Sequence, residues 1–440
     1  MGAPAVGKPK NEIEKLGAAV AGNGLLHRRV FLQGGLIAGG GALMAGGAQA
    51  AAAVGTAEAV GTAAPPWMKV PGRSFTAYGM PARWQENVAR IFNIVPGREG
   101  VGSSRTPLHY LEGTITPNGL HFERHHNGIP DIDPNRHELL IHGLVDRPLI
   151  FTMDSLMRYP METHIRFIEC AGNSGNINSG PEPAQVSAGD IHGLLSCSEW
   201  TGVRLATLLD EAGVDRAARW VIAESADAAA MSRSVPLWKC MDDAIIALYQ
   251  NGEAIRPEQG YPMRILLPGF EGNINVKWLR RLKVSAEPAY ARDETSKYSD
   301  IMPDGRARLF TLEMGAKSMI LRPSFGINMS GPGVYEISGL AWSGTGRVAK
   351  VEISADGGTS WAEAALTEPI LSKALTRFRL PWQWDGQPAL VMSRATDEHG
   401  NTQLFRDAWR AQYAPRHTYH YNAIQTWSVA PDGQVSNVYV

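Results

Sequence analysis

The sequence has few cysteines and no motif that pairs them. Only three occur among 440 residues, Cys170, Cys197 and Cys240, so they cannot all form disulfides with one another. No CxxC or CxxCH segment is present, which excludes an ordinary zinc knuckle and a covalently attached c-type haem. If a cysteine binds a metal or takes part in catalysis, it therefore acts as a single thiol, and the other residues of the site come from other segments of the chain.

An excess of charge of either sign is also missing. Lys and Arg number 42 and Asp and Glu number 43, a formal net charge of −1. Residues 1–50 hold five basic and two acidic residues, so the remainder has 37 against 41, or about −4. This balance gives no electrostatic argument for binding nucleic acid or an anionic membrane surface. With 44% hydrophobic and 19% charged residues, the chain is a globular protein of one large or two ordinary domains.

The N-terminal region lacks an apolar run long enough to span a membrane well. The segment after Arg28-Arg29 is glycine-rich and ends near Gly47, whereas a span needs about 20 apolar residues. A twin arginine ahead of such a segment, with Ala48-Gln49-Ala50 at the spacing of a cleavage site, predicts a twin-arginine export signal over residues 1–50. A membrane anchor is the alternative. Because this route carries folded proteins, we expect a periplasmic protein with its cofactor loaded before export and no membrane span after processing.

The rest of the chain changes its pattern twice. Residues 51–104 are rich in Ala, Gly and Pro and predict an extension that wraps the main domain. Residues 105–305 mix strands and helices and predict an α+β domain, with a helix over Trp200–Ala212. In residues 306–425, short strands alternate with turns, which predicts an all-β immunoglobulin-like sandwich with a role in assembly. Residues 426–440 are expected to be a C-terminal tail.

The segment from Phe167 to Asn173 is the strongest candidate for a functional centre. A short apolar strand delivers Cys170 into a loop of small residues, where a bulky group can approach the thiol closely. A thiolate is a soft ligand that suits a transition metal. A buried, inert cysteine at a strand end explains these residues equally well. Cys197 and Cys240 have no such loop beside them, and we interpret both as structural.

Basic and histidine residues gather in three further segments, Phe122–His126, Tyr261–Arg264 and Asn275–Leu279. Arg and Lys at strand ends and turns could bind a phosphate, Arg through its fork and Lys as a point charge. His125 and His126 are adjacent and would point apart on a strand, which favours hydrogen bonding over a shared metal. Taken singly, each segment is better explained by a surface salt bridge or a structural polar group.

Taken together and in this order, the segments resemble the sulfite oxidase family of molybdenum enzymes over most of residues 105–425. The combination of motifs is far more specific than any one of them. The matches are Cys170-Ala171-Gly172-Asn173 with the segment of the molybdenum thiolate ligand, Phe122 to His126 with Phe-x-Arg-Asn-His (His125 replacing Asn), Gly260 to Arg264 with Gly-Phe-Pro-x-Arg, Val276 to Leu279 with Val-Lys-Trp-Leu, and Tyr298 with the active-site tyrosine.

The resemblance implies a molybdopterin (pyranopterin–molybdenum) cofactor with Cys170 as its only protein ligand to the metal. It implies that Cys170, Tyr298 and Arg124 are catalytic. Gln259 stands where the family has a histidine that contacts the cofactor. The cofactor-binding residues implied by the resemblance are Phe122, Arg124, His125, His126, Asp227, Gln259, Arg264, Asn275, Val276 and Lys277.

Three departures from the family pattern bear on the substrate. Members that act on sulfite have a second arginine where this chain has Gly175, and a tryptophan where it has Gly189. They also carry an arginine near the C-terminus, and the nearest match here, Asn422–Gln425, has none. Sulfite is a small dianion that needs charge-assisted donors once it is desolvated. The expected pocket is wider and less positive, which suits sulfur presented on a larger carrier.

Within the family, the chain is most similar to the sulfane dehydrogenases of thiosulfate oxidation. This similarity implies oxidation of a sulfane sulfur held on a sulfur-carrier protein, with electrons passed to a c-type cytochrome because this chain has no haem of its own. It also implies a homodimer through the C-terminal domain within a hetero-oligomer. The alternatives are a periplasmic sulfite dehydrogenase, a reductive relative acting on sulfoxides, and a non-catalytic interaction subunit.

Overall fold

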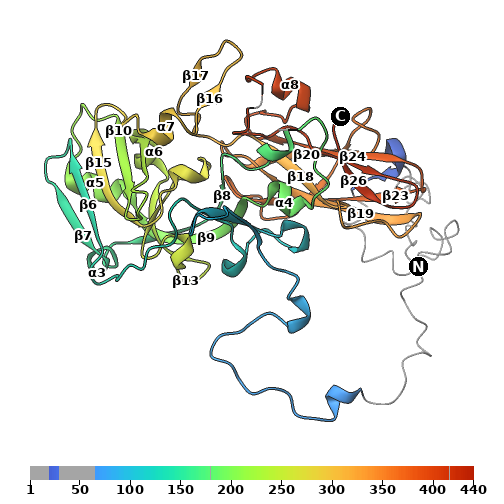
Figure 1. The fold of residues 1–440 in the computed structure, drawn as a ribbon, viewed down its shortest axis with the longest axis horizontal. Coiled ribbons are helices and arrows are strands. Elements are labelled where there is room, and N and C mark those ends of the chain that lie inside the picture. The colour runs from blue at the N-terminus through green and yellow to red at the C-terminus, as the bar shows by residue number, and fades with distance from the viewer. Residues whose placement is uncertain (1–18, 29–64, 179, 416) are drawn as a thin grey trace, which may run out of the picture.

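The computed structural model describes residues 19–28, 65–178, 180–415 and 417–440, which form two bodies side by side (Figure 1). An α+β body comes from the middle of the chain and an all-β body from its C-terminal part, which confirms the predicted fold class. Most of the expected export signal, including Arg29 and Ala50, lies outside the described residues. Within the described ranges, no helix is long and apolar enough to cross a membrane.

The α+β body is built on two five-stranded sheets with short helices around them. Its strands pair antiparallel except for β15 and β6, which are parallel. One sheet has the order β11 (Ser232–Pro236), β10 (Trp220–Ser225), β15 (Leu279–Ser285), β6 (Glu138–Gly143), β7 (Leu149–Thr152). The other has the order β13 (Glu253–Ala254), β12 (Ile245–Gln250), β9 (Leu195–Arg204), β8 (Met161–Glu169), with β14 (Arg264–Leu266) also on β12. The helices are α3 (Met153–Leu156), α4 (Ala188–His192), α5 (Leu205–Ala212), α6 (Leu237–Asp242) and α7 (Arg292–Thr295).

The helix predicted over Trp200–Ala212 is wrong in its first part. Trp200 to Arg204 continue strand β9, and only the remainder forms α5. Strand β9 is hydrogen-bonded to β8 on one side and to β12 on the other. A Cβ on Gly202 would lie 2.0 Å from the carbonyl oxygen of Ile246, so the two backbones touch there. Pairing on both edges decides the conformation, and it overrides the helical spacing of the leucines that follow.

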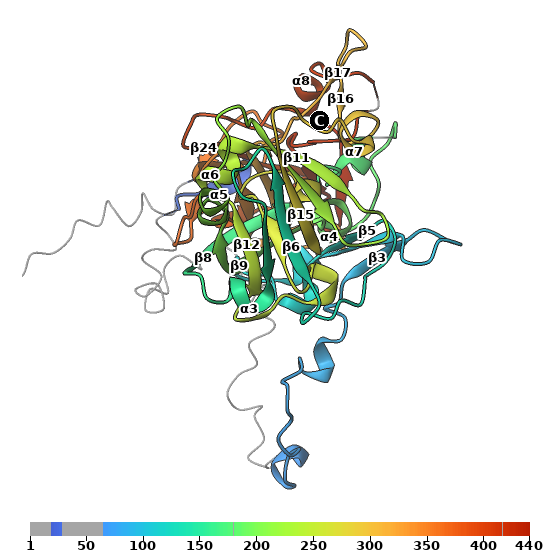
Figure 2. The same cartoon turned by 90° about the vertical axis from the view of Figure 1, so that its left-hand side faces the viewer.

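The described part of the N-terminal extension is not packed closely around the α+β body. Figures 1 and 2 show residues 65–90 as an extended arm, with Trp67, Phe75 and Trp84 exposed. Tyr78 of this arm is hydrogen-bonded to Glu253 and Arg256 of the body, both at 3.0 Å. The chain joins the body at a three-stranded sheet that leads to the candidate site. This sheet contains β3 (Ile91–Ile94), β4 (Gly102–Arg105) and β5 (Glu123–His125).

The C-terminal body is a sandwich of two antiparallel sheets. Residues 426–440 are not a tail, because they supply the last two strands of one sheet. That sheet has the order β21 (Ala362–Glu363), β20 (Val348–Ser354), β24 (Ala389–Asp397), β25 (Thr426–Val429), β26 (Val435–Val438). The other contains β1 (Ala19–Ala21), β2 (Leu25–Leu26), β23 (Thr376–Trp384), β19 (Gly333–Trp342) and β18 (Lys317–Arg322), with β22 (Ala365–Leu366) also on β23. In Figure 1 the hairpin of β16 (Asp300–Ile301) and β17 (Ala307–Arg308) projects from the upper side of the molecule, and helix α8 (Arg406–Arg410) lies above the sandwich.

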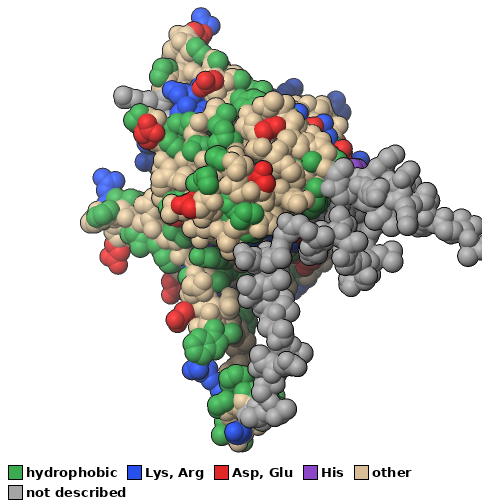
Figure 3. Space-filling model, turned by 90° about the vertical axis from the view of Figure 1, so that its right-hand side faces the viewer, with side chains coloured by type: hydrophobic (Ala, Val, Ile, Leu, Met, Phe, Trp, Pro, Cys, Tyr) green, Lys and Arg blue, Asp and Glu red, His purple; other side chains and the backbone are tan. Residues whose placement is uncertain are grey.

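Tryptophan side chains fill the space between the two sheets of the sandwich. Trp342, Trp382, Trp384 and Trp427 are all buried in one apolar cluster. Burial of aromatic side chains of this size contributes a large share of the hydrophobic stabilisation of a domain. The described outer surface at this end of the molecule carries scattered charges among apolar and uncharged polar side chains (Figure 3).

A buried ion pair joins the two bodies directly beside Cys170. Glu169, the last residue of β8, is fully buried. Its carboxylate accepts hydrogen bonds from Lys317 Nζ at 3.0 Å and Trp342 Nε1 at 2.6 Å, both from the sandwich. It also accepts one from Asn173 Nδ2 at 2.9 Å. The loop that contains Cys170, the candidate metal ligand, is therefore linked to the sandwich through the buried ion pair of Glu169 and Lys317.

We predict that Lys317→Met destabilises the protein by about 3–5 kcal/mol, because it leaves the Glu169 carboxylate buried without its cation. The double variant Glu169→Gln, Lys317→Met removes both charges and should recover much of that loss. The measurement is the free energy of unfolding from urea titration, followed by tryptophan fluorescence. A Lys317→Met protein as stable as the wild type would contradict the role given to this pair.

Candidate functional site

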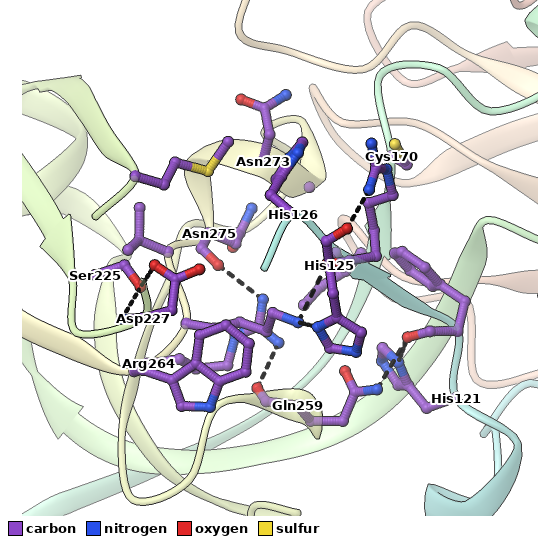
Figure 4. Close-up of a pocket in the computed structure, with 18 of the residues that line it drawn as sticks. His121, His125, His126, Cys170, Ser225, Asp227, Gln259, Arg264, Asn273 and Asn275 are labelled. Carbon is purple, nitrogen blue, oxygen red and sulfur yellow. Dashed lines mark hydrogen bonds between the residues drawn. The ribbon is translucent and has the colours of Figure 1, made fainter. Parts of the chain in front are cut away.

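A pocket with a volume of about 720 Å³, its open mouth included, lies in the α+β body. All twelve residues singled out from the sequence line it, although they come from segments far apart in the chain. Figure 4 shows several of these side chains turned toward one another. The residues concerned are Phe122, Arg124, His125, His126, Cys170, Asp227, Gln259, Arg264, Asn275, Val276, Lys277 and Tyr298.

Cys170 lies at the wall of this pocket, directly after strand β8. Its backbone N–H donates to Leu194 O at 2.9 Å, and its carbonyl accepts from Asn173 N at 2.8 Å, so the backbone around the thiol is fixed. Gly172 has open space where a Cβ would stand, which leaves room near the sulfur. Burial raises the pKa of the Cys170 thiol. Ionisation of this thiol therefore needs a strong electrophile such as a metal, which deprotonates the cysteine that it binds.

No group of three or more His, Cys, Asp or Glu side chains is arranged to hold a metal within the ranges that the structure describes. The histidines of the pocket instead make hydrogen bonds. His125 Nδ1 lies 3.0 Å from Lys277 Nζ, and its Nε2 lies 2.9 Å from Glu123 Oε2. Burial, followed by the charges of Lys277 and Arg124, lowers the pKa of His125 to about 3. His126 faces the same pocket, and burial also lowers its pKa.

Two buried cations on the pocket wall have no carboxylate within hydrogen-bonding distance. Arg264 donates to the carbonyls of Gln259 and Asn275 at 2.9 and 2.8 Å, while its Nε has no partner. Burial lowers the pKa of Arg264 to about 9. Lys277 Nζ donates to Glu258 O at 2.9 Å and is close to His125, and burial and the charge of Arg264 hold its pKa well below the ordinary value.

This arrangement fits an anionic group. Arg124, Arg264 and Lys277 face a pocket in which Asp227 is the only acidic residue among the described residues that line it. Buried cations without counter-ions are costly, and a phosphate that accepts from them would repay the desolvation. The buried Nε of Arg264 is a donor left over for such a group. The donors and the thiol across the pocket match the two ends of a phosphorylated, metal-bearing cofactor.

Two of the predicted binding residues use their side chains to hold the wall itself. Asn275 Oδ1 accepts from Leu267 N at 2.7 Å, and its Nδ2 donates to Glu271 O at 3.0 Å. Gln259 Nε2 donates to Phe122 O at 2.9 Å. Both residues line the pocket, so they position their neighbours in addition to any contact of their own.

Tyr298 lies near Cys170 and has unusual surroundings. Its backbone φ is +50°, a conformation that is strained for a bulky residue and that is often found at functional sites. The guanidinium carbon of Arg233 lies 5.3 Å from the centre of its ring, and the ring of Tyr419 lies 5.3 Å from it on centres. Burial, with the nearby charge of Cys170, raises the pKa of the Tyr298 hydroxyl, so it remains a hydrogen-bond donor at neutral pH.

The sandwich contributes a segment to this site that sequence reasoning missed. His420 N donates to Ala171 O at 2.8 Å, which places residues 417–421 against the cysteine loop. Its Nε2 lies 3.3 Å from Glu271 Oε2. Burial opposes the charged imidazolium, but the hydrogen bond and charge of Glu271 outweigh it and raise the pKa of His420. We expected the sandwich to have a role in assembly. The structure shows that it also packs against the loop that contains Cys170.

The same segment explains one of the departures noted in the sequence. A Cβ on Gly175 would lie 2.2 Å from Thr418 O, so backbone fills the space that a side chain at position 175 would need. A different contact explains a second departure, because a Cβ on Gly189 would lie 3.0 Å from the ring of His109. The glycines therefore accommodate neighbouring groups, and neither position leaves room for a large side chain.

Other lining residues had weak or no signals in the sequence. Trp278 lies within a motif already noted, whereas His121 and Asn273 stood outside the residues we selected. Cys197 and Cys240 are buried away from the pocket, and burial raises the pKa of both thiols, that of Cys197 to about 12.

Comparison with protein families gives two matches along the chain. The model of the oxidoreductase molybdopterin binding domain matches residues 126–292. The model of the Mo-co oxidoreductase dimerisation domain matches residues 308–427. The first match contains Cys170 and most of the pocket, and the second contains most of the sandwich.

The chain is also similar to individual proteins of known kind. It is 31% identical to mouse mitochondrial sulfite oxidase over 349 residues, which cover 72% of this chain and 60% of that protein. It is 29% identical to a nitrate reductase of Ulva prolifera over 333 residues, 66% of this chain and 38% of that protein. The chain thus matches about 60% or less of the length of these curated relatives. The crystal structure of the sulfane dehydrogenase SoxCD from Paracoccus pantotrophus superposes with a TM-score of 0.84 at 44% identity, covering 88% of this chain and all of that one.

We predict that Gly175→Ala destabilises the protein by about 1–3 kcal/mol, since its Cβ would overlap Thr418 O. Gly172→Ala is the matched control in the same loop, because its Cβ meets nothing within 4 Å. Thermal unfolding of both variants is the measurement. Equal melting temperatures for the two would show that segment 417–421 does not pack on the loop as described.

Proposed function

Because this chain belongs to the sulfite oxidase family of molybdenum enzymes, we propose that it is a periplasmic sulfane dehydrogenase subunit. Its substrate would be the sulfane sulfur of a thiosulfate-derived group on a sulfur-carrier protein. The observation that carries this proposal is the 44% identity, over the whole of the other chain, to the structure described as a sulfane dehydrogenase. The molybdopterin family match supports the type of cofactor.

In this proposal the pocket holds molybdopterin between its cationic wall and Cys170. Arg264 and Lys277 would bind the phosphate, and Cys170 would be the protein's ligand to molybdenum. Arg124 and His126 would contact the pterin side, with Asp227 as a hydrogen-bond acceptor. Bound there, the molybdenum cofactor supplies a two-electron centre for oxygen transfer to sulfur.

The remaining side chains act on the substrate end of the pocket. Tyr298 keeps its proton and would donate a hydrogen bond to an oxygen near the metal. The ring of Tyr419 packs beside that of Tyr298. These aromatic side chains offer contact area to a sulfur atom at the end of a flexible carrier group.

Conversion of a sulfane sulfur to a sulfonate adds three oxygen atoms from three waters and releases six electrons and six protons. Each oxygen transfer delivers two electrons, and they must leave singly through another redox protein. The sequence has no CxxCH segment. We therefore propose a separate c-type cytochrome as electron acceptor, and a homodimer formed through the domain of residues 306–425 within a hetero-oligomer. The match to a dimerisation domain supports the latter.

A sulfite dehydrogenase is the second candidate. The observation in its favour is the 31% identity to a mitochondrial sulfite oxidase over 349 residues. Against it stands Gly175, where Thr418 occupies the place of an additional cationic side chain. The presence of Cys170, Arg124 and Tyr298 around one pocket disfavours a non-catalytic interaction subunit.

The test is Mo(V) electron paramagnetic resonance on the protein exported with its own signal, recorded before and after anaerobic addition of sulfite. We predict a Mo(V) signal with a chemical reductant and none with sulfite, because Gly175 stands where the family members that act on sulfite have a second arginine. A signal raised by sulfite would establish the second candidate. A protein without molybdenum after export would overturn both.

The assignment of the metal ligand has its own test. We predict that Cys170→Ser abolishes turnover and the Mo(V) signal while pterin content stays near the wild-type level, because the phosphate contacts of Arg264 and Lys277 survive. Cys197→Ser is the matched control, since this thiol is buried away from the pocket. Normal turnover in Cys170→Ser would rule out the ligand role.

A further inference from the structure

Ten residues of the predicted leader are folded against the sandwich. Ala19–Ala21 and Leu25–Leu26 form strands β1 and β2, and Leu25 pairs antiparallel with Trp382 of β23. Strand β23 would otherwise present part of an open sheet edge there. This contact lies at the end of the molecule opposite to the α+β body (Figure 1) and belongs to neither the pocket nor the joint between the domains.

The apolar part of this contact is as buried as the core of a domain. Leu25 is 0% and Leu26 is 6% exposed. Leu25 lies in the same apolar cluster as Trp382 and Trp384. Val20 of the same segment is 45% exposed. The segment is therefore buried mainly through its two leucines.

Polar contacts add specificity to this burial. Gly22 N donates to Ser360 Oγ at 2.6 Å, and Asn23 Nδ2 donates to Ala355 O at 2.7 Å. The carbonyl of Asn23 accepts from Trp382 Nε1 at 2.5 Å. These partners come from strand β23 and from the loop after β20, so they come together only once the sandwich has folded.

The turn between the two strands fits the sequence Gly22-Asn23-Gly24 closely. Asn23 and Gly24 have φ of +54° and +83°, values that favour Asn and Gly. A Cβ on Gly24 would lie 2.0 Å from Gln383 O. One on Gly22 would lie 2.1 Å from Asp356 Oδ2. A side chain at Gly24 would overlap backbone of β23 and would push the segment off the sheet, whereas one at Gly22 would meet the carboxylate end of Asp356.

The docked segment ends at the first residue of the twin arginine. Arg28 forms an ion pair with Glu363 of β21, on the sandwich surface. This holds the first arginine of the motif on the folded domain, where its guanidinium is only partly exposed.

We propose that the sandwich carries a docking slot for its own leader, and that residues 19–28 occupy it in the precursor as an added β-strand. The occupied slot covers the edge of β23, which protects an unpaired edge from pairing with other chains. It also keeps Arg28 engaged until the export machinery displaces it. Removal of the leader vacates the slot. The displacement of Arg28 and this last step rest on the proposed export route, whereas the docking of residues 19–28 does not.

The test uses the full-length precursor, purified from the cytoplasm of cells whose twin-arginine export is blocked. Hydrogen exchange of residues 19–28, and trypsin cleavage after Arg28, report docking. We expect slow exchange and slow cleavage in the wild type. Gly24→Ala and Leu25→Ala should increase both rates by roughly 30-fold or more, the effect of losing a buried leucine or of overlap with Gln383. Val20→Ala, with an exposed side chain, should leave them unchanged.

Exchange in strands β9 and β24 shows in the same samples whether the variants keep their fold. Wild-type residues 19–28 that exchange as fast as an unstructured peptide would overturn the proposal. So would Gly24→Ala and Leu25→Ala variants that exchange like the wild type. The intact mass of the exported protein tests the last step, and retention of residues 19–28 after export would contradict the vacated slot.

Discussion

The buried Glu169 carboxylate is the interaction on which the geometry of this protein depends. It lies next to Cys170 in sequence, and its partners Lys317 and Trp342 belong to the other domain. A charge held without water needs good geometry from all its donors, so a shift of the sandwich would be transmitted to the cysteine loop. Lys317 Nζ also donates to Ser174 Oγ at 2.8 Å, which ties a second point of that loop. The sandwich is therefore part of the scaffold of the pocket as well as a candidate for assembly.

The two buried cations of the pocket wall differ from Glu169, because neither has a carboxylate partner among the described residues. Arg264 and Lys277 are buried cations whose partners are neutral carbonyls and an imidazole, and the pKa values of both are lowered. The protein's own groups satisfy such cations poorly, so the site is suited to an anion. Glu169 is compensated by its own chain, whereas these two cations have no carboxylate partner among the described residues. We therefore interpret Glu169 and Lys317 as structural charges, and Arg264 and Lys277 as charges available for binding a ligand.

The sequence predicted the fold class and the residues that line the pocket, because the motifs are local and each one carries its own strand end or turn. Predictions from the sequence were wrong or incomplete where the conformation of a segment depends on pairing or packing with segments distant in the chain. Trp200–Arg204 form a strand since two neighbours pair with it, and residues 426–440 join a sheet whose other strands lie far upstream. Tyr419 and His420 reach the site through packing between domains, and Arg233 reaches it from strand β11 of the same body. No short pattern exists for either kind of contact. The roles of the lining residues remain predictions, because their placement alone does not assign them.

The contact between His420 and the cysteine loop also has a consequence for the order of events during biosynthesis. His420 follows Ala171 by 249 residues, so the ribosome makes the cysteine loop long before the segment that packs on it. Until that segment arrives, the loop lacks one of its walls, and Glu169 lacks Lys317 and Trp342. The pocket reaches its final shape only after the sandwich has been translated and has folded. Insertion of a cofactor into the finished site is thus a post-translational step.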